Sequence, residues 1–114
     1  MEIQGEKYRV FYDAATATVK FQGVLRLYGV QGYSEIANLL DEVEKQAPPL
    51  ITLDVQELEF LNSSGISTLF RFVIAVRNRA ASEILALGSQ KIVWQEKALS
   101  NLQHLMPSLR IEIL

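Results

Sequence analysis

The sequence predicts a single α/β domain, residues 1–114, whose elements follow in the order β-β-α-β-α-β-α-β. Three observations support this prediction. Apolar and polar residues alternate in two N-terminal segments. Apolar residues recur at helical spacing in three later segments, and short apolar runs separate these helical segments from one another. Alternating helices and strands favour a largely parallel sheet with right-handed crossovers, and a hairpin at the start makes the sheet mixed.

The N-terminal segment is predicted to form the hairpin. Residues 8–12 alternate between two faces, and residues 17–22 do so again with one polar face. Asp13-Ala14-Ala15 lies between them and would turn the chain back.

The next elements are a helix and a buried strand. After Gly23, Gly29 and Gly32, apolar residues recur at helical spacing: Val30, Tyr33, Ile36, Leu39, Leu40 and Val43. Pro48-Pro49 ends this helix because proline lacks the N–H that a helix needs. The run from Leu50 to Val55 is short and partly β-branched, which is typical of a buried strand with Asp54 near its C-terminal end.

The C-terminal half repeats the alternation. A second helix is predicted to face the sheet with an apolar stripe of Ile66, Leu69, Phe70, Val73 and Ile74. Residues 84–87 form a short apolar strand closed by Gly88, and residues 93–105 form a third helix that Pro107 stops. Residues 109–113 alternate again and predict the last strand.

Composition excludes several classes of function. The net charge is -2 and no basic stripe is present, so we expect neither direct nucleic-acid binding nor attraction to anionic membranes. The chain has no cysteine and His104 is its one histidine, which leaves no usual metal or haem site, and we expect no cofactor. No apolar run approaches the roughly 20 residues of a membrane span, and the N-terminus lacks the pattern of a signal peptide. We therefore expect a cytoplasmic location.

Catalytic motifs are also missing. No Gly-x-Ser-x-Gly elbow, Walker loop or Gly-x-Gly-x-x-Gly fingerprint occurs, and a Ser-His-Asp site would have to use His104 late in a predicted helix. We expect no enzymatic activity.

The segment Asn62-Ser63-Ser64-Gly65 has two interpretations. A serine before a helix accepts a hydrogen bond from the first turn, typically worth about 1 kcal/mol, and the neighbouring glycine relieves crowding in a tight turn. The same helix N-terminus would also stabilise an anion, so a phosphate on one serine would be tolerated by the fold and would change any surface that docks there. The residues alone leave both interpretations open.

The stretch LDVQELEFLNSSGISTLF, residues 53–70, resembles the signature of the STAS domain, which is shared by anti-sigma factor antagonists and the cytoplasmic tails of sulfate transporters. The order of elements agrees with that family along nearly the whole chain. The resemblance implies a STAS-type mixed sheet with helices packed mainly on one face.

The resemblance also implies a signalling role. In bacterial antagonists, the serine before the glycine accepts phosphate from a kinase that is also an anti-sigma factor, and a phosphatase resets the cycle. That serine is Ser64 here, with Ser63 as its neighbour. The implied protein is a phosphoprotein in a partner-switching pathway of transcription regulation, which binds a kinase-like anti-sigma factor and a phosphatase.

Two positions depart from the family pattern. The residue before the serine pair is usually aspartate in the phosphorylated antagonists and is Asn62 here, which could equally be a turn residue bonded to its own backbone. An acid at the end of an early strand is replaced by Arg26. An arginine beside Ser64 would favour a phosphate, because opposite charges about 4 Å apart attract by about 1 kcal/mol in water and about 4 kcal/mol at a dielectric near 20. Alternatively, Arg26 is a solvated residue at the strand end, and kinase recognition has been lost.

The expected docking surface combines the loop and the second helix. The resemblance implies that Asn62, Gly65, Thr68 and Phe72 shape it. Phe72 lies to one side of the predicted stripe, where it is either core or an aromatic anchor for a partner. Two alternative functions remain: a constitutive adaptor that binds the ATPase of a transporter, and a module that binds a small ligand or nucleotide.

Overall fold

The computed structural model describes all residues 1–114 and has one six-stranded sheet with the strand order β1-β2-β3-β4-β5-β6. The first three strands pair antiparallel and the last four pair parallel, so the sheet is mixed, as predicted. The elements are β1 (Glu2–Gln4), β2 (Tyr8–Asp13), β3 (Thr18–Leu25), α1 (Gly29–Gly32), α2 (Ser34–Gln46), β4 (Leu50–Leu61), α3 (Ser63–Arg79), β5 (Glu83–Gly88), α4 (Gln95–Leu105) and β6 (Arg110–Ile113).

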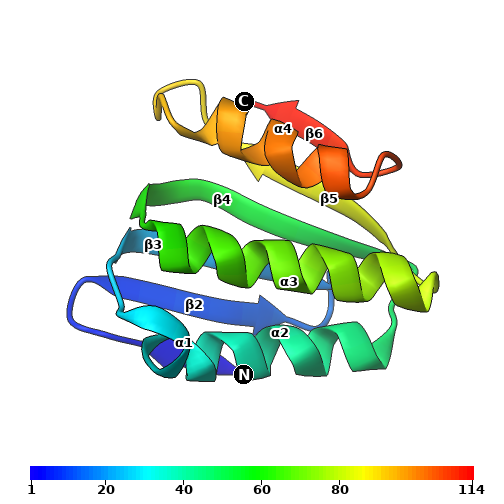
Figure 1. The fold of residues 1–114 in the computed structure, drawn as a ribbon, viewed down its shortest axis with the longest axis horizontal. Coiled ribbons are helices and arrows are strands. Elements are labelled where there is room, and N and C mark those ends of the chain that lie inside the picture. Colours follow the sequence, from blue (N-terminus) through cyan, green and yellow to red (C-terminus); the bar gives the residue numbers. More distant parts are fainter.

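The helices cover one face of the sheet, as the resemblance implied (Figure 1). Strand side chains that point toward the helices are buried, and with the inner helix faces they form one core cluster. The strand members of this cluster include Val10, Val19, Phe21, Ile51, Leu53 and Ile84. Burial of apolar surface of this kind contributes about 25 cal/mol per Å² and is the main source of stability for such a two-layer fold.

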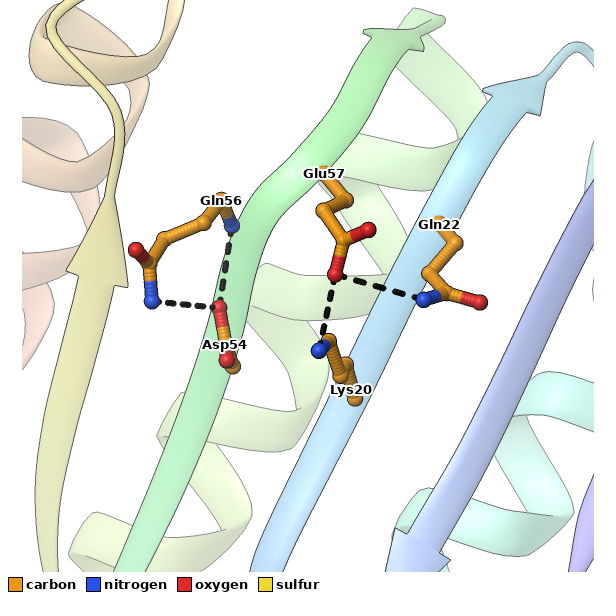
Figure 2. A network of polar contacts seen from close by, with 5 residues as sticks. All are labelled: Lys20, Gln22, Asp54, Gln56 and Glu57. Atoms are coloured by element: carbon orange, nitrogen blue, oxygen red, sulfur yellow. Dashed lines mark hydrogen bonds and ion pairs between the residues drawn. The ribbon is translucent and has the colours of Figure 1, made fainter.

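The opposite face of the sheet is not covered by helices and carries two groups of polar contacts. Lys20 Nζ pairs with Glu57 Oε2 at 2.7 Å, and Gln22 donates to the same oxygen at 3.3 Å (Figure 2). Within β4, the backbone N–H and the side-chain amide of Gln56 both donate to Asp54 Oδ1. The Lys20–Glu57 pair is partly exposed to solvent, so it adds little stability.

Two strands differ from the sequence prediction. β1 was not predicted, since three residues are too few to show a period. β4 runs to Leu61 rather than ending near Val55, so Asp54 lies in mid-strand. The extension pairs with β3 through two register shifts, and the side-chain amide of the buried Gln95 donates to the carbonyl oxygens of Val55 and Leu58 at 2.5 and 2.9 Å. A residue from α4 therefore satisfies backbone groups that an irregular strand leaves unpaired.

α3 is rotated relative to the predicted stripe. Leu69 and Val73 are buried as expected, whereas Ile66, Phe70 and Ile74 are only half-buried. The helix instead buries Thr68, Phe72 and Val76 together with Gly65. α3 lies between α2 and α4 in the helical layer (Figure 1). Its Ile66 and Phe70 side chains line a small apolar cavity together with residues of α4, whereas the other flank is fully buried.

Candidate functional site

The junction between β4 and α3 is organised by Asn62. Its Oδ1 accepts a hydrogen bond from the Gly65 backbone N–H at 3.1 Å, which makes Asn62 the N-cap of α3. The same oxygen accepts from the Tyr33 hydroxyl at 2.6 Å, and Nδ2 donates to the Leu27 carbonyl oxygen at 2.8 Å. One amide thus joins the start of α3 to the segment between β3 and α2.

The cap is therefore Asn62 and not a serine. Ser63 and Ser64 are the first two residues of α3; Ser63 is exposed and Ser64 is half-exposed. Neither hydroxyl forms a hydrogen bond, whereas the Ser64 carbonyl oxygen accepts from the Thr68 hydroxyl at 2.9 Å. The capping interpretation of the serines is wrong, because the asparagine side chain has already taken the free N–H of Gly65.

Gly65 is required by packing rather than exposed for docking. It is buried, and a Cβ at this position would lie 2.2 Å from Leu61 Cδ1 and 2.8 Å from the Tyr33 hydroxyl oxygen. Thr68 and Phe72 are each 3% exposed. The expectation that these three residues form a docking surface is therefore corrected, since this flank of α3 is packed inside the molecule.

Tyr33 supports this junction from inside the molecule. Its side chain is 1% exposed, and its hydroxyl also lies 3.3 Å from the Leu25 carbonyl oxygen. Burial raises the pKa of the Tyr33 phenol above its usual value. The phenol therefore stays protonated and keeps donating to Asn62 over the whole physiological pH range.

Arg26 lies at the same end of the sheet as the serine pair. It follows β3 directly and is exposed, and the Asn62 N–H donates to the Leu25 carbonyl oxygen at 3.2 Å, which holds the two strand ends side by side. Its guanidinium carbon lies 4.6 Å from the centroid of the Phe60 ring. Neither a hydrogen bond nor an ion pair joins Arg26 to a serine, so its observed partner is Phe60.

Large apolar side chains are exposed in the α1 segment and in the segment before α4. Tyr28 and Val30 are 91% and 71% exposed on the α1 side, and Val93 is 94% exposed on the α4 side. An open depression, here called the α3–α4 groove, is lined by Phe60, Leu61, Ile66, Val93, Trp94, Lys97, Ala98 and Asn101. Such exposed clusters are typical of interaction sites. Sequence reasoning missed this surface, because its parts come from the end of β4, the start of α3, and α4 with the loop before it.

Trp94 is placed in this groove by its indole N–H, which donates to the Glu59 carbonyl oxygen at 2.9 Å. Because it is the one tryptophan of the chain, its fluorescence reports on whatever occupies the groove.

The surroundings hold no group of three or more metal-ligating side chains. No helix in the structure has both the length and the apolar character needed to cross a membrane.

Solved structures resemble the chain over its full length. SiaC of Pseudomonas aeruginosa superposes with a TM-score of 0.74 at 11% identity, covering 100% of this chain and 98% of that one. A chain in the crystal structure of the diguanylate cyclase SiaD in complex with its activator SiaC, from the same organism, gives 0.73 at 12% identity, with 99% and 97% covered. An anti-sigma factor antagonist from Mycobacterium paratuberculosis gives 0.64 at 16% identity, with 95% and 90% covered.

The chain has the STAS-type fold. No protein-family model and no curated protein sequence matches it. At these identities the likeness extends to the fold alone. Within that fold, Arg26, Asn62, Ser63 and Ser64 gather at one end of the sheet, whereas Thr68 and Phe72 belong to the core.

Proposed function

We propose that this protein is a non-enzymatic signalling module that binds a protein partner beside the start of α3 and is switched by phosphorylation of Ser64. One observation supports this most directly: the free hydroxyls of Ser63 and Ser64 lie in the first turn of a 17-residue helix, and Leu61 and Ile66, on either side of them in the sequence, line the α3–α4 groove. A modifiable group and an apolar docking surface therefore adjoin each other.

A phosphate on Ser64 would be favoured by its surroundings. The helix N-terminus stabilises an anion by about 0.3–1 kcal/mol, and up to about 2 kcal/mol in partly buried geometries. Arg26 would have to leave the Phe60 ring, which costs roughly 0.5–1 kcal/mol at an exposed site, while a charge-assisted hydrogen bond contributes about 1.5–3 kcal/mol. The balance favours the movement of Arg26 to the phosphate.

The proposed partners follow the STAS resemblance of residues 53–70. They are a serine-kinase-like anti-sigma factor that phosphorylates Ser64 and a phosphatase that reverses the reaction, in the cytoplasm. The likeness of fold to the mycobacterial anti-sigma factor antagonist supports this choice. Phosphate would weaken binding by adding roughly two negative charges at the margin of the apolar groove.

A second candidate partner is a diguanylate cyclase that the protein would activate. The likeness to SiaC favours it, because SiaC is described as the activator of SiaD and the two chains superpose from end to end. Both candidates use the same surface and the same serine, and they differ in the enzyme that is bound.

Affinity capture from the native cells, followed by mass spectrometry of bait and co-purified proteins, tests the proposal. We expect a kinase-like ATPase or a cyclase with the wild type, phosphate on Ser64, and loss of that partner with Ser64→Asp. Ser67→Asp is the matched control, since Ser67 is exposed on the same helix. A transporter ATPase captured equally by both variants, with Ser64 unmodified, would instead establish a constitutive adaptor.

A second variant tests the docking surface independently of the switch. Val93→Asp places a charge in the α3–α4 groove at a side chain that supports no core contact, since Val93 is 94% exposed. We expect it to abolish partner capture while the thermal unfolding temperature stays unchanged. Undiminished capture by this variant would locate the docking surface elsewhere.

A further inference from the structure

The outer edge of β6 is the feature that the proposed function does not use. β6 ends the sheet on one side, and no strand or helix lies beyond it (Figure 1). An uncovered edge presents unpaired backbone N–H and C=O groups, which a further strand can pair with.

The hydrogen bonds of the last residue establish which backbone groups face outward. The Leu114 N–H donates to the Gly88 carbonyl oxygen, and the Leu114 carbonyl oxygen accepts from the Gln90 N–H, both at 2.9 Å. Leu114 therefore faces β5. Because successive residues of a strand direct their backbone groups to opposite sides, Ile113 and Ile111 direct theirs to the free edge.

The charges of this strand are arranged symmetrically about Ile111. Arg110 and Glu112 flank it, point to the uncovered face of the sheet and are both exposed. Neither takes part in an ion pair or a side-chain hydrogen bond, whereas Arg9, Lys20 and Arg79 are all paired with acids. Their lateral neighbours on β5 are the half-buried Leu85 and Leu87.

We propose that β6 is a self-association edge, on which a second copy of this chain adds its own β6 antiparallel, with Ile111 opposite Ile111 on the twofold axis. This register joins the outward backbone groups of Ile111 in a hydrogen-bonded pair. It also places Arg110 of each copy opposite Glu112 of the other, so two cross-strand ion pairs form on one face.

The charges of β6 favour pairing with a second copy of β6 over pairing with an unrelated strand. Like charges on an edge strand normally prevent self-pairing, but a positive and a negative residue placed symmetrically about the centre attract each other. The partly buried Ile111 would lose its remaining exposure against its copy. Because β6 has only four residues, the contact is small, and the dimer is expected to be weak and concentration-dependent.

Analytical ultracentrifugation over a range of protein concentrations tests this proposal with a charge exchange. We expect a reversible monomer–dimer equilibrium for the wild type. Arg110→Glu and Glu112→Arg should each weaken dimerisation roughly tenfold, because two attractive pairs become two repulsive ones, and the double variant R110E/E112R should restore it. Glu6→Arg, which changes the net charge as Glu112→Arg does but lies in the turn after the opposite edge strand β1, should dimerise like the wild type.

Amide hydrogen exchange locates the contact. The Ile111 N–H should become more protected as the protein concentration rises, while exchange at Glu6 stays constant. The proposal is overturned by a chain that remains monomeric at the highest concentration, by association that the single reversals do not weaken, or by open-ended polymers, which would indicate a contact between different edges.

Discussion

The Tyr33 hydroxyl donates a 2.6 Å hydrogen bond to Oδ1 of Asn62, 29 residues away in the sequence. This bond connects the first residue before α2 with the N-cap of α3, at the point where Ser63 and Ser64 begin that helix. The position of the serine pair therefore depends on a buried phenol that lies outside the loop.

Replacing Tyr33 by phenylalanine removes this bond without opening a cavity. We expect a loss of about 1 kcal/mol in the free energy of unfolding, because the Asn62 oxygen keeps only its bond from Gly65. Urea unfolding followed by Trp94 fluorescence measures the change. Tyr28→Phe, at a side chain that is 91% exposed, is the control and should leave stability unaltered.

The same phenol makes stability sensitive to alkaline pH. Burial raises the pKa of Tyr33 above the usual tyrosine value of 10.0, so the folded state holds its proton more tightly than the unfolded chain does. This contribution is complete below pH 10.0 and is lost as pH rises from there through the folded pKa. Stability curves of wild type and Tyr33→Phe should therefore converge above pH 10.0, and curves that stay parallel would contradict this account.

Asn62→Asp restores the residue that the family pattern has before its serine pair. The carboxylate would still cap α3 and gain about 0.3–1 kcal/mol from the helix N-terminus, but it could not donate to the Leu27 carbonyl oxygen. Loss of that partner costs about 1–3 kcal/mol, so we expect net destabilisation of about 1 kcal/mol at neutral pH.

The loss of stability caused by Asn62→Asp should become smaller as the pH falls below the aspartate pKa of about 4, since the protonated acid can donate again. Thermal unfolding at neutral and acidic pH, relative to the wild type at each pH, measures it. An equal loss of stability at neutral and acidic pH would show that the lost hydrogen bond to Leu27 is not its cause.

Ser64→Asp should stabilise the isolated protein slightly. An acid in the first turn of α3 interacts with its N-terminus by about 0.3–1 kcal/mol, and the first turn holds no acid in the wild type. Thermal unfolding at low and high salt checks this, since screening should remove most of the gain. Ser67→Asp lies one turn further along and should gain less.

The sequence by itself determined the local elements of this fold. Periods of two in residues 8–12 and 17–22, and helical spacing in residues 66–77, arise from contacts that every strand or amphipathic helix makes with a core, and those elements are confirmed. The place of the serine pair, at the start of α3 beyond a buried strand, followed from the same patterns together with the STAS resemblance.

The roles of individual site residues became clear only in the tertiary structure, because they depend on contacts with distant parts of the chain. Phe72 looks like a flank residue until the packing of α3 in the helical layer buries it, and Asn62 looks like a turn residue until Tyr33 and Leu27 reach it. The groove beside Val93 is likewise assembled from separate elements, β4, α3 and α4. Periodicity records which side of an element faces the core, whereas burial of the flanks and long-range hydrogen bonds depend on how the elements pack against one another.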